Sequence, residues 1–89
     1  MKAVITVVGR DRVGIIYEVS KVLAENNVNI LDISQTIMQD MFTMIMLVSI
    51  DKTEVSVSSL SAVLDEVGSN MGVSIKMQHE DLFNSMHRI

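Results

Sequence analysis

The alternation of apolar segments with polar breaks constrains this chain more than any other feature. Residues 2–8 form an almost unbroken apolar, β-branched run, which predicts a buried strand. Residues 28–39 alternate as an edge strand does, and residues 41–50 are apolar on both parities. The whole pattern predicts strand, helix, strand, strand, helix and strand, over residues 2–8, 13–26, 28–39, 41–50, 55–70 and 73–80.

Both predicted helices are amphipathic and carry terminal signals. Asp11 is expected to act as the N-cap of the first, and Asn26 or Asn27 to end it in a left-handed conformation. Gly72 is expected to end the second helix. The predicted inward faces comprise Ile15, Ile16, Val19, Val22 and Leu23 in the first helix, and Val57, Leu60, Val63, Leu64, Val67 and Met71 in the second.

This order of elements predicts the fold. Crossovers between parallel strands are right-handed, so the order gives a four-stranded antiparallel sheet with both helices on one face. The expected α+β fold is the ferredoxin-like βαββαβ sandwich, with strands in the order four, one, three, two. We expect a single domain over residues 1–80 and a tail over 81–89. The tail is predicted to form a short C-terminal amphipathic helix, with Asp81 as its N-cap and Leu82, Phe83, Met86 and Ile89 on its apolar side.

The predicted second strand lacks the usual protection of an exposed sheet edge. It contains no Lys, Arg or Pro, and Asp32 is its only charge, whereas the fourth strand carries Lys76 and Glu80. We therefore expect this edge to pair with its own copy across a two-fold axis, forming an eight-stranded sheet. The alternatives are that the tail shields the edge or that the edge stays unpaired.

Composition excludes several classes of function. The chain has no cysteine, which rules out disulfides, a thiol nucleophile and thiolate metal ligands, and we predict no metal and no cofactor. A pI near 4.9 and only seven Lys and Arg residues argue against binding nucleic acid. No apolar run approaches the roughly 20 residues of a membrane span, and the N-terminus does not resemble a signal peptide. The sequence predicts a cytoplasmic protein.

The segment Gly-Arg-Asp-Arg-Val-Gly at residues 9–14 is the most distinctive part of the chain. It joins a strand end to a helix start, where free N–H groups and the positive end of the helix dipole suit a carboxylate or phosphate. Gly9 and Gly14 permit close approach, and Arg10 and Arg12 add positive charge. The spacing matches neither a dinucleotide fingerprint nor a P-loop. An anion site and a capped turn with two solvated arginines both remain open.

No catalytic constellation is evident. The serines at positions 56, 58, 59 and 61 crowd the start of the second helix without a nearby histidine in sequence, which indicates capping and surface roles. His79 shares its parity with apolar residues and is expected to pack or to end the fourth strand, rather than to bind metal. Asp32 is expected either to make a local hydrogen bond or to receive a ligand amino group.

Two strings of residues carry a resemblance to a known family. They are T-V-V-G-R-D-R-V-G-I-I from Thr6 to Ile16 and A-E-N-N-V-N-I-L-D-I-S from Ala24 to Ser34. Together with the βαββαβ order, they make residues 2–80 resemble an ACT domain. The chain is most similar to small stand-alone ACT proteins related to the glycine-cleavage transcriptional repressor.

The resemblance implies a homodimer that binds a small molecule, typically an amino acid, at its interface. Backbone N–H groups at the helix start would hold the ligand carboxylate, and Asp11 or the partner's Asp32 would meet its ammonium group. Val13 departs from the proline that many members have there. The implied ligand positions are Gly9, Arg10, Asp11, Arg12, Val13 and Gly14 of one protomer, with Asn29, Ile30, Leu31 and Asp32 of its partner.

The sequence therefore predicts a non-enzymatic regulatory domain that homodimerises, binds an amino acid and modulates a separate protein, without contacting nucleic acid or membrane. One alternative is a dimerisation or protein-interaction module without a ligand. The other is an acylphosphatase-like hydrolase, in which Arg10 or Arg12 holds phosphate and Asn29 orients water. Asp11 would repel phosphate, which disfavours the hydrolase.

Overall fold

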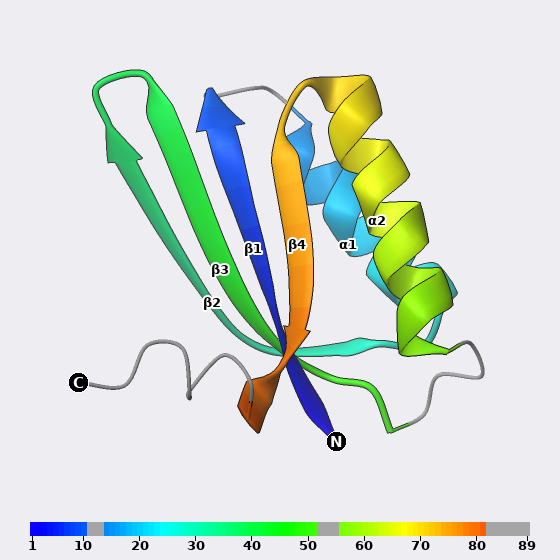
Figure 1. Cartoon of the computed structure of the whole chain (residues 1–89). Coiled ribbons are helices and arrows are strands. Elements are labelled where there is room, and N and C mark those ends of the chain that lie inside the picture. The colour runs from blue at the N-terminus through cyan, green and yellow to red at the C-terminus, as the bar shows by residue number, and fades with distance from the viewer. Residues whose placement is uncertain (11–13, 52–55, 82–89) are drawn as a thin grey trace.

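The computed structural model describes residues 1–10, 14–51 and 56–81. The antiparallel sheet has the strand order β2-β3-β1-β4, and both helices lie on one of its faces (Figure 1). This confirms the predicted α+β, ferredoxin-like fold. The tail helix predicted after Asp81 lies outside the described residues. The elements are β1 (Lys2–Arg10), α1 (Ile15–Glu25), β2 (Asn29–Met38), β3 (Met41–Ser49), α2 (Val57–Met71) and β4 (Ser74–His79).

The core lies between the central strands and the helices. No polar or charged residue is buried in the part of the chain that the structure describes, so the core is apolar throughout. Leu60 and Leu64 of α2 and Val19 and Leu23 of α1 are essentially inaccessible to solvent. The fully buried pairs between β1 and β3 are Ala3 with Val48, Ile5 with Met46 and Val7 with Met44.

Within these same described ranges, no helix is long and apolar enough to cross a lipid bilayer.

Helix α1 begins two residues later than the pattern predicts. Gly14 is its N-cap residue and has a φ of 93°, a left-handed conformation that lies outside the helical region. Asp11, the expected cap, lies outside the described residues. The C-terminal expectation is confirmed, because Asn27 has a φ of 58° and the Val28 N–H donates to the Leu23 carbonyl at 2.9 Å.

Helix α2 is capped at both ends by its own sequence. The hydroxyl of Ser56 accepts a hydrogen bond from the Ser59 N–H at 3.1 Å, which confirms a capping role for this serine cluster. Gly72 has a φ of 74°, and the Val73 N–H donates to the Gly68 carbonyl at 2.9 Å. The predicted glycine cap is therefore confirmed.

Three residues predicted to face inward are exposed instead. Ile16 is 42% exposed, Val57 38% and Val63 42%. The buried residues of α1 follow a narrow stripe to which Ile16 is adjacent, and α2 likewise buries only one side of its apolar surface. Helical spacing identified the apolar side of each helix but overestimated the width that the sheet covers.

Strand β2 is exposed along its entire length, on both faces. Its pairing with β3 shifts between Ile30 and Asp32, which leaves Leu31 as the extra residue of a β-bulge. The bulge places Ile30 opposite Val48 and Ile33 opposite Met46, on the helix-facing side. Strict alternation of residues 28–39 would place Ile30 on the same face as Asp32, but the one inserted residue reverses the parity after it.

Gly9 and Gly14 are needed for different physical reasons. A Cβ on Gly9 would lie 2.5 Å from Cγ1 of Val73 and 2.9 Å from its Cβ, so glycine lets β1 approach the residue before β4. A Cβ on Gly14 would meet nothing within 4 Å, but the φ of 93° there strains any other residue.

We predict that Gly9→Ala lowers the free energy of unfolding by about 1–3 kcal/mol through overpacking. Gly14→Ala should lower it by about 1–2 kcal/mol through backbone strain. Combining each with Val73→Ala in urea-denaturation experiments separates these causes. Val73→Ala should recover part of the loss in the Gly9 variant and none in the Gly14 variant. If adding Val73→Ala changed the free energy of unfolding equally in the Gly9 and Gly14 variants, the two assigned causes would be contradicted.

Candidate ligand site at the ends of the sheet

The residues predicted to bind ligand lie at opposite ends of one protomer. Arg10 ends β1 opposite Met41, whereas Asn29 begins β2 opposite Ser49. Met41 and Ser49 are eight residue steps apart along β3, which corresponds to about 27 Å. Arg10 of one chain therefore cannot hold a phosphate next to a water that Asn29 of the same chain orients, as the hydrolase alternative with Arg10 requires. Residues 11–13 of the predicted site lie outside the described residues.

At the start of α1, the N-cap residue offers no side-chain acceptor. Gly14 has no side chain, so the N-cap residue cannot accept a hydrogen bond from the first-turn N–H groups. Ser56 supplies such an acceptor to α2. Nη1 of Arg10 lies 3.5 Å from Oδ2 of Asp40 in the β2–β3 hairpin, with both side chains largely exposed. This end of the sheet therefore combines a helix N-terminus with an accessible guanidinium.

The candidate residues of β2 are also accessible. Ile30 and Leu31 are 37% and 44% exposed, at the bulge. Oδ1 of Asp32 accepts a hydrogen bond from the Ile33 N–H at 2.8 Å, the local role that the sequence left open for this carboxylate. The Asp32 carboxylate thus binds the N–H of the residue that follows it.

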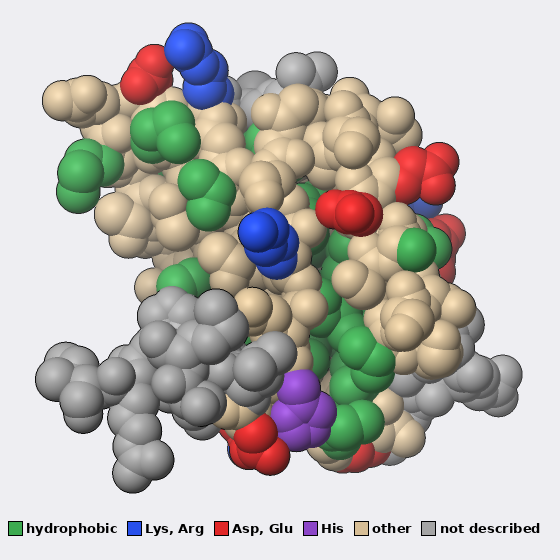
Figure 2. Space-filling view, viewed as in Figure 1, with side chains coloured by type: hydrophobic (Ala, Val, Ile, Leu, Met, Phe, Trp, Pro, Cys, Tyr) green, Lys and Arg blue, Asp and Glu red, His purple; other side chains and the backbone are tan. Residues whose placement is uncertain are grey.

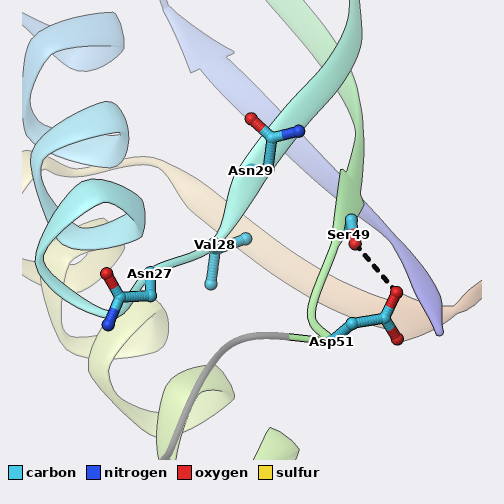
Figure 3. Close-up of a pocket in the computed structure, with 5 residues that line it drawn as sticks. All are labelled: Asn27, Val28, Asn29, Ser49 and Asp51. Carbon is cyan, nitrogen blue, oxygen red and sulfur yellow. Dashed lines mark hydrogen bonds between the residues drawn. The ribbon is translucent and has the colours of Figure 1, made fainter.

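A hollow of about 650 Å³ opens at the start of β2 (Figure 3). The Asp51 carboxylate in its wall already has partners: the Ser49 hydroxyl donates to it at 3.2 Å, and the Met1 amino group also donates to it. Sequence reasoning identified only Asn29 here. It missed the other polar residues because they come from separate segments that meet through the pairing of β2 with β3. The lining residues are Asn27, Val28, Asn29, Ser49 and Asp51.

The hairpin determines which backbone groups of β2 face outward. Met38 and Met41 lie opposite each other across a two-residue loop in which Gln39 has a φ of 57°, as in primed hairpin turns. Such a loop closes on a hydrogen-bonded pair, and hydrogen-bonded pairs then alternate along the ladder. The N–H and C=O groups of Ile33, Gln35 and Ile37 therefore point away from β3. The bond from the Ile33 N–H to Asp32 agrees with this phase.

Comparison with known proteins identifies the family. A model of the ACT domain matches residues 2–78. A UPF0237 protein of Clostridium acetobutylicum is 58% identical over 89 residues, which cover all of both chains. An ACT domain protein from Streptococcus pneumoniae has a TM-score of 0.81 and 39% identity, covering 98% of each chain. A putative glycine cleavage system transcriptional repressor has a TM-score of 0.75 and 28% identity, covering 86% of this chain and 44% of that one.

The fold is that of a regulatory, small-ligand-binding domain. The chain belongs to the ACT domain family, as its two characteristic strings and its topology indicated. Its full-length similarity to UPF0237 and ACT domain proteins also confirms the resemblance to small ACT proteins.

We predict that the Arg10–Asp40 pair contributes little to stability. Its side chains are 84% and 70% exposed, and such pairs are typically worth less than about 1 kcal/mol. Arg10→Ala and Asp40→Asn should each shift the free energy of unfolding in urea by less than this amount. A larger loss of unfolding free energy that high salt does not relieve in either variant would show that Arg10 has a packing role instead.

Proposed function

We propose that this chain is a non-enzymatic cytoplasmic regulator that homodimerises along β2 and binds an amino acid at the interface. The ligand would lie between residues 9–14 of one protomer and residues 29–32 of its partner, and would change how the dimer contacts a separate protein. The observation that carries this proposal is β2, a ten-residue edge strand whose residues are all exposed.

The straight part of β2 specifies how two copies would pair. After the bulge it runs from Asp32 to Met38, and Gln35 is its centre. A two-fold axis at Gln35 places Ile33 opposite the partner's Ile37, so that apolar side chains meet twice on the helix-facing side. The two Asp32 carboxylates then lie about 20 Å apart along the strands. An axis at Asp32 itself would bring these like charges together, which disfavours that register.

This pairing brings the two halves of the predicted site to the same end of the sheet. The partner's β2 runs in the opposite direction, so its start lies beside the β2–β3 hairpin. The partner's Asp32 falls in one row with Met38, Met41 and Arg10, about 14 Å from Arg10 across three strand spacings. Arg10 thus lies about 14 Å from the partner's Asp32, whereas Arg10 and Asn29 of one chain lie about 27 Å apart.

The chemistry at this end suits a zwitterion. The first-turn N–H groups of α1 and the helix dipole favour a carboxylate, with Arg10 adding positive charge. The partner's Asp32 would accept the ammonium group, and the partner's Asn29 would orient either group. Because the ligand binds only the dimer, it would stabilise that state by about 2.7 kcal/mol at a hundred times its Kd.

A ligand-free dimerisation module is the second candidate. It is favoured by the fact that two predicted ligand residues already have structural partners. Gly9 approaches Val73, and Arg10 pairs with Asp40. This alternative keeps the β2 interface and predicts that no metabolite affects its stability.

We predict that one amino acid among the twenty raises the midpoint of thermal unfolding, because it binds the folded dimer. The measurement is a thermal melt of purified protein at two protein concentrations. Asn29→Ala should remove the ligand effect while retaining the concentration dependence, and Asn70→Ala on α2 serves as a matched control. A midpoint that depends on concentration but on no amino acid would favour the ligand-free module.

We predict that Gln35→Cys forms a disulfide-linked dimer under mild oxidation, because that residue faces its own copy at the axis. Directly opposed residues of a hydrogen-bonded pair have Cα atoms about 5.5 Å apart, within disulfide range. The chain has no native cysteine to interfere. Ile33→Cys is the control, since its two copies would be offset by about 14 Å along the strands. Efficient cross-linking of Ile33→Cys alone would contradict this register.

A further inference from the structure

The sheet face opposite the helices differs in charge from the helices themselves. By strand register, its strands carry the cationic residues Lys2, Arg10 and Lys76 and the carboxylate of Asp32, and Asp40 of the β2–β3 hairpin lies 3.5 Å from Arg10. The described helices carry the opposite balance: Glu18, Glu25, Asp65 and Glu66 against Lys21. Three of the four Lys and Arg residues that the structure describes thus lie on the open face, in a chain with a net charge of -4.

The same face carries a cluster of exposed apolar side chains, which we call the open-face patch. It consists of Val8 on β1, Met38 on β2, and Met41 and Ile45 on β3. Met38 is the most accessible at 70%, and the other three range from 36% to 45%. Figure 2 shows hydrophobic side chains gathered over the β2–β3 side of the sheet, with a basic side chain beside them.

Two cations border the patch on its β1–β4 side. Arg10 lies directly opposite Met41, and Lys76 lies opposite Thr6, which is itself opposite Ile45. Arg10 and Lys76 are therefore about 14 Å apart along neighbouring strands, a distance that a helix covers in two to three turns. The apolar band and the cationic band run side by side within about 10 Å, the diameter of one helix.

We propose that the open face docks an acidic amphipathic helix of a separate protein. Its apolar stripe would cover the open-face patch, and carboxylates two to three turns apart would meet Arg10 and Lys76. The Arg10–Asp40 pair does not prevent this, because exposed pairs are weak and a second carboxylate can share the guanidinium. Pairing along β2 does not cover this face, although it brings the partner's Asp32 into the row of Met38, Met41 and Arg10. The docking site therefore exists in the protomer, and in the proposed dimer it borders the amino-acid site.

A membrane surface fits these observations less well. Binding to anionic lipids through charge requires clusters of about four to eight basic residues. Arg10 and Lys76 are the only basic residues that the register places beside the patch among the described positions, and Asp32 lies on the same face. This inference deepens the proposed function by naming the chemistry of the regulated partner.

The test uses two labelled synthetic peptides of equal length, one with leucine and glutamate at helical spacing and one with lysine replacing glutamate. Fluorescence anisotropy with the full chain should show the acidic peptide binding at least about tenfold more tightly, with affinity falling as salt rises. Lys76→Glu should weaken acidic-peptide binding by at least about fivefold. Lys21→Glu on α1 makes the same charge change on the other face and should alter binding by less than about twofold.

Ile45→Glu should abolish binding, and Met41→Glu provides a second variant if the first perturbs folding as judged by circular dichroism. Equal binding of both peptides, or equal losses in the Lys21 and Lys76 variants, would overturn the proposal. So would binding of phosphatidylserine vesicles without peptide binding, or self-association that Ile45→Glu abolishes without peptide binding. Peptide binding requires neither an added amino acid nor the cross-link formed by Gln35→Cys. Failure of the proposed function would therefore be distinguished from failure of this docking proposal.

Discussion

The unpaired edge of β2 is the constraint on which the rest of the structure depends. The apolar core ends at β3, whose helix-facing residues are buried, whereas every residue of β2 is exposed. Backbone N–H and C=O groups at Ile33, Gln35 and Ile37 point away from β3. Asp32 already accepts the Ile33 N–H, and water can satisfy the other groups. Water does not remove the apolar side chains beside them from solvent. A second β2 strand satisfies both requirements at once.

The β-bulge at Leu31 gives that edge its specificity. One inserted residue rotates Ile30 onto the same face as Ile33 and leaves a straight segment after it. It also places the Asp32 carboxylate where it accepts the Ile33 N–H, which ends the row of open donors at one side. The open segment of β2 runs from Asp32 to Met38, has Gln35 at its centre and carries a charge only at Asp32. Such a strand can pair with its own copy in few registers. The bulge thereby links a local irregularity to the way in which two copies would build a ligand site.

Much of the fold could be predicted from local signals. The order of the strands followed from apolar runs and alternation, and Asn27 and Gly72 ended their helices as residue type suggested. The bulge was missed because hydrophobic parity cannot reveal a one-residue slip in pairing. Ile16, Val57 and Val63 were misplaced because helical spacing does not specify how wide a stripe the sheet covers.

The candidate site was less predictable because it depends on distant parts of the chain. Arg10 meets Asp40 only because β3 carries the hairpin back beside the end of β1. Asn29 joins Ser49 and Asp51 around the hollow by the same pairing. The sequence gives each residue its chemistry, whereas register determines its neighbours. The two halves of the predicted site illustrate this most clearly, since no single protomer brings them together.

In the proposed dimer a second copy of the chain completes the sheet edge at β2, and amide hydrogen exchange followed by NMR tests this pairing most directly. The Gln35 and Ile37 amides face outward and should exchange rapidly at low protein concentration. At high concentration they should become protected, while the inward-facing Ser34 and Thr36 amides should remain protected throughout. Rapid exchange of Gln35 and Ile37 at every concentration would contradict the account.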